Sequence, residues 1–279
     1  MNKPARPRTG WRPKKSLGQN FLANEGIARK IVEAAGIRPG ETVMEIGPGQ
    51  GALTGLLVER AERVIAVELD HEMARTLPTR VRSDRLTVIE RDILRTDLFA
   101  LGQQFGVARW PIVANLPYVI SSRLLVRLVE QVRVVERATM MVQLEVGERI
   151  LADPGSRTYG LLSVLLQATG HLRRGFRVGP GAFRPVPKVH SLVFTWTSDV
   201  PDGVNIPALV ATTKAAFGQR RKRLDNALKR LPDVTPDEIA EACAHAGIDP
   251  GLRAEQLASD DYIRLSTSFE RLGVLPPRQ

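Results

Sequence analysis

The chain has 279 residues, 43% of them hydrophobic and 25% charged, which is ordinary for a folded protein and long enough for one large domain and a smaller one. Its 40 Lys and Arg against 30 Asp and Glu give a net charge of +10, which predicts a polyanionic partner such as nucleic acid. One cysteine, Cys243, excludes an intramolecular disulfide and a cysteine-based zinc site, and the four histidines show no paired spacing, so we expect no metal.

No apolar run in the sequence approaches the length of a membrane span, so we expect no membrane association. The N-terminus is basic but has no apolar signal-peptide core, which predicts a cytoplasmic protein. The first 15 residues are basic and interrupted by prolines and a glycine, which predicts a flexible basic arm over residues 1–15. The texture becomes compact and partly apolar from Ser16, where we place the start of a folded domain that ends at residue 198.

A glycine-rich stretch at residues 43–54 follows, reading Val-Met-Glu-Ile-Gly-Pro-Gly-Gln-Gly-Ala-Leu-Thr. An apolar run enters it and a helical pattern leaves it, which predicts a strand, a tight turn and a helix. Glycines suit such a turn because the backbone must bend sharply and let a ligand lie against it. The spacing is Gly-x-Gly-x-Gly rather than the Gly-x-Gly-x-x-Gly of dinucleotide binders, and with Glu45 before it the stretch resembles the first motif of S-adenosylmethionine-dependent methyltransferases.

Strand-like and helical patterns then alternate along the chain. Apolar strand-like runs occur at residues 63–70, 86–92, 110–118 and 138–144, and the last two of these are separated by a helical pattern. Strands spaced by helices predict an α/β fold with a mostly parallel sheet covered on both faces. Residues 171–178 and 191–197 alternate more regularly, and we expect them to form an antiparallel pair at the edge of the sheet.

The composition changes at residues 199–207, which are rich in Asp, Pro and Gly and are predicted to be a linker. Only helical patterns follow, at residues 209–217, 221–231, 237–246 and 260–272, which predicts a small all-helical domain over 208–279. Its most distinctive feature is the run Arg220, Arg221, Lys222 and Arg223, which we place at the start of a helix. Cations there oppose the helix dipole, so we interpret the run as a contact for nucleic-acid phosphates rather than a solvated face.

Acidic side chains end two of the predicted strands. Ligands of an open α/β sheet bind at the carboxyl ends of its strands, near the point where the strand order reverses. Glu68 lies 21 residues after Gly47, where an acid can accept hydrogen bonds from both hydroxyls of a ribose. Asp92 is placed to accept a hydrogen bond from an adenine amino group. An adenosine cofactor is therefore expected, either NAD or S-adenosylmethionine.

The turn Asn115-Leu116-Pro117-Tyr118 separates these two cofactors. A hydride transferase has no need of it, whereas a methylase acting on an exocyclic amine needs acceptors for the amine hydrogens. The Asn115 side-chain carbonyl and the Leu116 backbone carbonyl can supply those acceptors, and Pro117 fixes the turn. The Tyr118 ring can stack on the base and favour the positive charge that develops on it.

Six segments of the sequence occur in an order and spacing that match a known family. They are residues 16–22, 45–54, 115–118, 159–164, 183–189 and 217–228. Together they resemble the ribosomal RNA small subunit adenine dimethyltransferase family, over nearly the whole chain. The resemblance implies a Rossmann-like class I S-adenosylmethionine-dependent methyltransferase sheet with a small C-terminal all-helical domain.

The resemblance also implies a reaction, a partner and a set of site residues. The reaction is methyl transfer from S-adenosylmethionine to N6 of two adjacent adenosines, dimethylating both, in a hairpin loop near the 3′ end of 16S ribosomal RNA. The partner is the small (30S) ribosomal subunit or its precursor during ribosome biogenesis, and the enzyme is expected to be a monomer. The implied cofactor contacts are Asn20, Leu22, Gly47, Glu68, Asp92 and Asn115. The implied contacts to the target adenine are Asn115, Leu116, Pro117, Tyr118 and Phe183, and the RNA contacts are Lys188, Arg220, Arg221, Lys222 and Arg223.

Three other interpretations fit the sequence less completely. The 23S ribosomal RNA dimethylases of macrolide resistance look similar as far as the glycine loop, but they typically read Asn-Ile-Pro-Tyr and lack a run like that at 219–222. A ribosome-assembly factor with a vestigial methylase fold would be favoured by loss of Glu68 or Asn115, and both are present. An NAD-dependent oxidoreductase accounts only for the stretch from Gly47 to Glu68.

Overall fold

The computed structural model describes residues 20–275, so the predicted basic arm and residues 16–19 lie outside the described residues. The strands are β1 (Phe21–Leu22), β2 (Thr42–Ile46), β3 (Arg63–Glu68), β4 (Leu86–Glu90), β5 (Trp110–Asn115), β6 (Val135–Gln143), β7 (Gly170–Val178), β8 (Phe183–Arg184) and β9 (Ser191–Ser198). The α-helices of the first part are α1 (Glu25–Ala34), α2 (Thr54–Leu57), α3 (His71–Arg80), α4 (Leu98–Phe105), α5 (Ser121–Glu130), α6 (Leu144–Ile150) and α7 (Leu161–Ala168). Those of the last part are α8 (Ile206–Phe217), α9 (Leu224–Leu228), α10 (Pro236–Ala246) and α11 (Ser259–Arg271).

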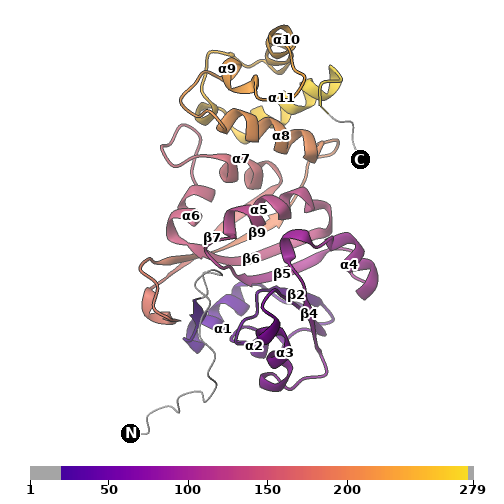
Figure 1. Cartoon of the computed structure of the whole chain (residues 1–279), viewed down its shortest axis with the longest axis vertical. Coiled ribbons are helices and arrows are strands. Elements are labelled where there is room, and N and C mark those ends of the chain that lie inside the picture. Colours follow the sequence, from indigo (N-terminus) through magenta and orange to yellow (C-terminus); the bar gives the residue numbers. More distant parts are fainter. Residues whose placement is uncertain (1–19, 276–279) are drawn as a thin grey trace.

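The main sheet has seven strands in the order β4-β3-β2-β5-β6-β9-β7 (Figure 1). The first five are parallel to one another, and β9 and β7 run antiparallel at one edge. The predicted parallel sheet with an antiparallel edge pair is therefore confirmed. Successive strands spread outward in opposite directions from β2 and β5, so the strand order reverses between these two. The sheet thus predicts a ligand site at the carboxyl ends of β2 and β5.

Alternate residues of each central strand enter two different cores. On β2, Val43 packs with α1 and α2 on one face, while Met44 and Ile46 pack with α5 and α7 on the other. On β5, Val113 faces the first core and Ile112 the second. Both faces are covered because successive side chains of a strand point to opposite sides, and both are apolar, as a sheet buried on both faces requires.

The chain after residue 206 forms the all-helical part at one end of the molecule (Figure 1). Its helices α8 and α11 pack on α7, and their buried side chains continue the core of the α5–α7 face. Two predicted boundaries shift. Helix α8 begins at Ile206, inside the predicted linker, because Asn205 caps it by accepting a hydrogen bond from the Ala208 N–H at 3.1 Å.

The second shift concerns the basic run, which does not start a helix as predicted. Helix α9 begins only at Leu224, and residues 220–222 form a turn in front of it. Arg223 is extended and pairs with Arg253 in an isolated β-bridge. The local pattern did not reveal this bridge because its partner lies thirty residues further along the chain. The cations of this run therefore do not oppose a helix dipole, contrary to the prediction.

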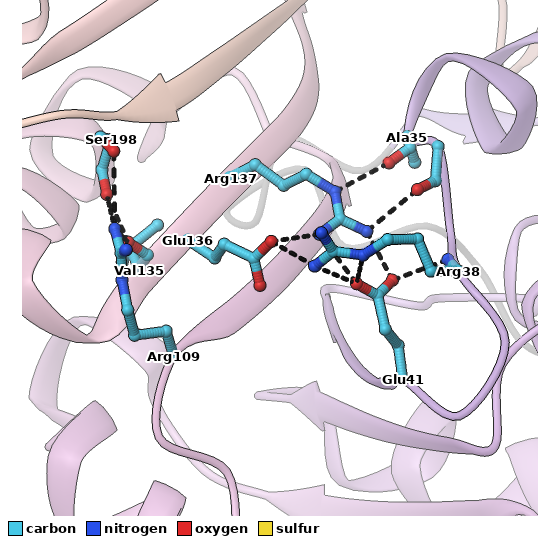
Figure 2. Close-up of polar contacts among 9 residues, drawn as sticks. Ala35, Arg38, Glu41, Arg109, Val135, Glu136, Arg137 and Ser198 are labelled. Atoms are coloured by element: carbon cyan, nitrogen blue, oxygen red, sulfur yellow. Dashed lines mark hydrogen bonds and ion pairs between the residues drawn. The ribbon is translucent and has the colours of Figure 1, made fainter.

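A polar cluster at the amino ends of β2 and β6 fixes helix α1 on the sheet (Figure 2). The Arg137 guanidinium, on β6, donates hydrogen bonds at 3.0 Å to the carbonyl oxygens of Ala35 and Gly36, at the end of α1. It also pairs with Glu41 and, at 2.9 Å, with Glu136. The cluster supplies partners for carbonyls that the last turn of a helix leaves unpaired. Helix α1 follows β1, so this attachment also places the segment that forms one wall of the site described next.

Candidate active site

A cavity of about 290 Å³ lies at the carboxyl ends of β2, β3 and β5, where the strand order predicts a ligand site. The predicted site residues that line it are Asn20, Leu22, Gly47, Glu68, Asp92, Asn115, Leu116, Pro117 and Tyr118. They come from five separate segments of the chain. The structure therefore brings the predicted cofactor residues and the predicted adenine-binding turn to one shared space.

The glycine loop forms the floor of this cavity and needs glycine for its conformation. Gly47, Gly49 and Gly51 have φ angles of +68°, +54° and +88°, in the left-handed region that other residues rarely adopt. Gly49 is also crowded, because a Cβ there would lie 2.8 Å from Cε1 of Phe21. The loop can thus approach a ligand with its backbone and keep Phe21 of β1 against it.

Glu68 ends β3 and organises this loop. One carboxylate oxygen accepts a hydrogen bond from the Gly49 N–H at 3.0 Å, and the other accepts from the Asp70 N–H at 2.9 Å. Burial raises the pKa of Glu68, and the two backbone hydrogen bonds oppose that shift. Each oxygen keeps a lone pair for a further donor. The side chain is buried but lines the cavity, so those lone pairs are placed to receive ligand hydroxyls.

Glu45 is a cavity residue to which the sequence assigned no role of its own. It is the fourth residue of β2, it is 1% exposed, and its Oε2 has no hydrogen-bond partner among the residues of the range 20–275. Burial raises the pKa of its carboxyl to about 8; the Glu68 carboxylate adds to the shift and the Thr54 hydroxyl opposes it. A buried oxygen without a partner costs free energy unless a ligand supplies a donor. The signal available in the sequence was an acid inside an otherwise apolar strand.

Asp92 and Asn115 follow β4 and end β5 respectively, on either side of the glycine loop. Asp92 accepts a hydrogen bond from the Leu94 N–H at 2.9 Å with one oxygen, and its other oxygen lies 3.8 Å from Nε of Arg95. The Asn115 side-chain N–H donates to the backbone oxygen of Asn20 at 3.4 Å. This bond turns the amide so that its carbonyl oxygen is the atom left to accept from a ligand.

The turn after β5 is held by its own backbone and by β9. The Pro117 carbonyl oxygen accepts hydrogen bonds from the Ile120 N–H at 3.2 Å and the Ser121 hydroxyl at 2.9 Å. Tyr118 is half-buried, and its hydroxyl lies 3.0 Å from the Ser191 hydroxyl. Burial raises the pKa of Tyr118, so the phenol is neutral in the physiological range. The turn therefore presents an amide, a backbone and an aromatic ring to the same cavity.

Comparison with known proteins decides the family. Residues 11–271 match the family model described as ribosomal RNA adenine dimethylase. The chain belongs to the ribosomal RNA adenine dimethylase family. The predicted family and the predicted methyltransferase fold are thereby confirmed.

Individual relatives of this adenine dimethylase agree with that assignment. It is 44% identical to the ribosomal RNA small subunit methyltransferase A of Acidobacterium capsulatum over 261 residues, which cover 92% of this chain and 91% of the relative. The protein of the same name from Geobacter metallireducens is 39% identical over 272 residues, 95% of this chain and 98% of the relative. Among solved structures, a dimethyladenosine transferase from Plasmodium falciparum superposes with a TM-score of 0.75 at 25% identity, covering 91% of this chain and 99% of that one. The 23S rRNA methyltransferase ErmE has the same fold, with a TM-score of 0.61 at 24% identity over 90% of this chain and 100% of its own.

One predicted adenine contact of this dimethylase lies away from the cavity. Phe183 is 1% exposed and packs in the core beneath α1 and α2, where its strand β8 pairs with β1. It lies outside the cavity lining and supports Leu22, its partner in that pairing, which does line the cavity. Lys188 is exposed in the segment between β8 and β9.

The predicted RNA contacts of the basic run differ from one another in their surroundings. The Arg220 guanidinium donates hydrogen bonds to the carbonyl oxygens of Ser156 and Arg157, at 3.4 and 2.7 Å, and lies 3.7 Å from Glu255. It therefore ties the helical part to the segment between α6 and α7. Arg221, Lys222 and Arg223 are exposed, with Arg223 3.0 Å from a carboxylate oxygen of Asp225. The outward-facing charge of the run is carried by these three.

The dimethylase cavity has other lining residues that sequence reasoning missed. Leu69 is 52% exposed and follows Glu68, so an apolar side chain stands beside the predicted ribose acceptor. Arg123, on the first turn of α5, adds an exposed cation next to the Asn115–Tyr118 turn. An apolar residue next to a functional acid was the signal for Leu69, whereas Arg123 had none.

Within residues 20–275, no group of three or more His, Cys, Asp or Glu side chains is arranged to hold a metal ion. No helix in the same range is both long and apolar enough to cross a membrane. Cys243 is buried, and burial raises the pKa of its thiol to about 11. The absence of a metal and the cytoplasmic location stay predictions.

Proposed function

We propose that this adenine dimethylase transfers methyl groups from S-adenosylmethionine to N6 of two adjacent adenosines in a hairpin loop near the 3′ end of 16S ribosomal RNA. The substrate would be the small ribosomal subunit or its precursor, during ribosome biogenesis. The observation that carries the proposal is the single cavity that joins the glycine loop to the Asn115–Tyr118 turn. A methyl donor on the first and an exocyclic amine on the second would meet in that space.

The cavity residues fit the cofactor. S-adenosylmethionine, when bound, supplies an electrophilic methyl group on a sulfonium. Glu68 would accept from the ribose hydroxyls, Asp92 from the adenine amino group, and Leu69 would lie along the adenine. The partnerless oxygen of Glu45 fits the cationic amino-acid end of the cofactor, because an ammonium would satisfy a buried acceptor that otherwise lacks a donor. Gly47, Asn20 and Leu22 complete the lining, the first by its backbone.

The Asn115–Tyr118 turn would orient the target adenine. The Asn115 side-chain carbonyl and the Leu116 backbone carbonyl would each accept a hydrogen from the N6 amine, which directs the nitrogen lone pair toward the methyl group. The Tyr118 ring would stack on the base and favour the charge that develops on N6 in the transition state. Pro117 holds the turn through its carbonyl bonds to α5. Phe183 would act from behind this wall, through Leu22, rather than on the base.

The remaining basic residues would position the RNA. Lys188, Arg221, Lys222 and Arg223 are exposed and suited to phosphates, which carry position rather than sequence information. Arg220 joins them in the sequence, but its contacts to the 156–157 carbonyls support a structural role as well. We propose that the enzyme acts as a monomer without a metal.

Mass spectrometry of ribosomal RNA tests the proposal. A strain lacking the protein should have two adjacent unmodified adenosines in its 16S RNA, and the wild-type gene should restore two methyl groups on each. Purified protein should transfer labelled methyl groups to unmethylated small subunits from that strain. Methylation confined to 23S RNA, or none in either RNA, would contradict the proposal.

A further inference from the structure

We infer that Ser191 is a positioning residue of the active site, which holds the Tyr118 ring in place for the target base. The inference rests on the proposed function, since it assigns a task to Tyr118 in adenine binding. Its basis is the contact between the two hydroxyls, whose oxygens lie 3.0 Å apart. One of the two hydroxyls donates and the other accepts. The residues are 73 positions apart in the sequence, so only the fold brings them together.

Ser191 is a fixed point on the sheet. It is the first residue of β9, it is 0% exposed, and it lies between Gln143 of β6 and Val178 of β7. Just before it, the His190 carbonyl oxygen accepts a hydrogen bond from the Leu144 N–H at 2.9 Å. A serine side chain has one rotatable bond before its oxygen, so a fixed backbone leaves the hydroxyl few positions.

Tyr118 is the less constrained partner. It stands in the turn between β5 and α5, it is half-buried, and the next residue, Val119, is 64% exposed. An aromatic side chain at such an edge can turn about χ1 between the cavity and solvent. A hydrogen bond at the far end of the ring selects one of these orientations. This accounts for a tyrosine at a position where stacking alone would be served by phenylalanine.

The consequence for catalysis follows from where the contact lies. Loss of the hydrogen bond would leave the ring in the productive orientation for a smaller fraction of the time, so methyl transfer would slow. Cofactor binding should not change, because Glu68 and Asp92 reach the cavity from β3 and β4, on the other side of β2. A purely structural role for Ser191 would instead lower stability and leave transfer per folded molecule unchanged.

The experiment compares Ser191→Ala, Tyr118→Phe and the double variant, in the full-length protein. The measurements are single-turnover methylation of unmethylated small subunits at saturating enzyme, the apparent Kd for the subunits, and the Kd for S-adenosylmethionine by calorimetry. Thr195→Val is the matched control. Thr195 lies on the same face of β9, is also buried, and its hydroxyl lies 3.1 Å from that of Thr139 on β6, so the control removes a comparable hydroxyl pair away from the cavity.

We expect each single variant to lower the single-turnover rate about five- to tenfold, the effect of one ordinary hydrogen bond. The double variant should lose no more than either single variant, since both remove the same bond. Both dissociation constants, and the rate of the Thr195→Val control, should stay within about twofold of wild type.

A wild-type rate for Ser191→Ala or for Tyr118→Phe would overturn the inference, as would losses that multiply in the double variant or an equal loss in the control. If Ser191→Ala fails to fold, Tyr118→Phe tests the same bond from its exposed end. Failure of the wild-type protein itself to methylate small subunits would count against the proposed function instead.

Discussion

Glu68 offers the sharpest test of the cofactor site, because its carboxylate has both neighbours and a ligand to satisfy. Its two oxygens already accept from the Gly49 and Asp70 N–H groups, so Glu68→Ala removes the acceptor for the loop and for the ribose together. Hydrogen bonds to a charged group contribute about 1.5 to 3 kcal/mol each. We expect the Kd for S-adenosylmethionine, measured by calorimetry, to rise about 10- to 150-fold.

Glu68→Gln should fall between Glu68→Ala and wild type. The amide keeps one acceptor oxygen but places an NH₂ group against the other backbone N–H, where two donors face each other. The matched control is Glu90→Gln. Glu90 is the register partner of Glu68 on β4, it lies 2.7 Å from His71, and it stands outside the cavity lining, so its loss should leave the Kd unchanged.

The ligand can be varied as well as the protein, which separates a ribose contact from an effect on the loop. Wild-type protein should bind S-adenosylhomocysteine more tightly than the same molecule without its ribose 2′-hydroxyl. The Glu68→Ala variant should bind the two alike, since the acceptor for that hydroxyl is gone. A Kd for Glu68→Ala within threefold of wild type, or a variant that still distinguishes the two ligands, would refute the assignment.

Three further predictions concern the turn, the basic run and the buried acid. Asn115→Ala should slow single-turnover methylation about a hundredfold while most of the affinity for small subunits remains, and a rate within fivefold of wild type would contradict its role. Replacing Arg221 and Lys222 with Gln should make the slope of log K against log salt shallower by about 0.7 to 0.9 for each phosphate that the variant no longer binds, whereas Arg220→Ala should lower the unfolding temperature by about 2–4 °C for each 1 kcal/mol of tethering that it removes; equal slopes and equal unfolding temperatures would refute this division. Glu45 has a folded-state pKa of about 8, above its unfolded value, so wild-type stability without cofactor should fall as pH rises from 5 to 8, by up to about 1.4 kcal/mol per pH unit, while Glu45→Gln removes that fall; denaturant unfolding at both pH values measures it, and a pH-independent difference between the two proteins would exclude a buried titrating acid.

The sequence by itself determined the parts of this protein whose physics is local. Glycines at 47, 49 and 51 were predicted to form a ligand loop because only glycine adopts positive φ at so little cost, and all three have positive φ in the structure. Apolar runs separated by helices predicted a parallel sheet, and parallel strands bring their carboxyl ends to one edge. For that reason the sequence alone was enough to expect Glu68 and Asn115 near each other.

Tertiary structure alone decided how residues distant in the chain share their partners. Phe183 carries an adenine-binding expectation in its motif, yet the pairing of β8 with β1 buries it behind Leu22. Arg220 reads like its basic neighbours, yet the packing of α8 on α7 turns it toward backbone carbonyls of the segment before α7. The contact of Tyr118 with Ser191 depends on the antiparallel addition of β9 beside β6, which no local pattern encodes. Burial, pairing and charge neutralisation arise from neighbours across the fold, and a residue's own sequence context does not contain them.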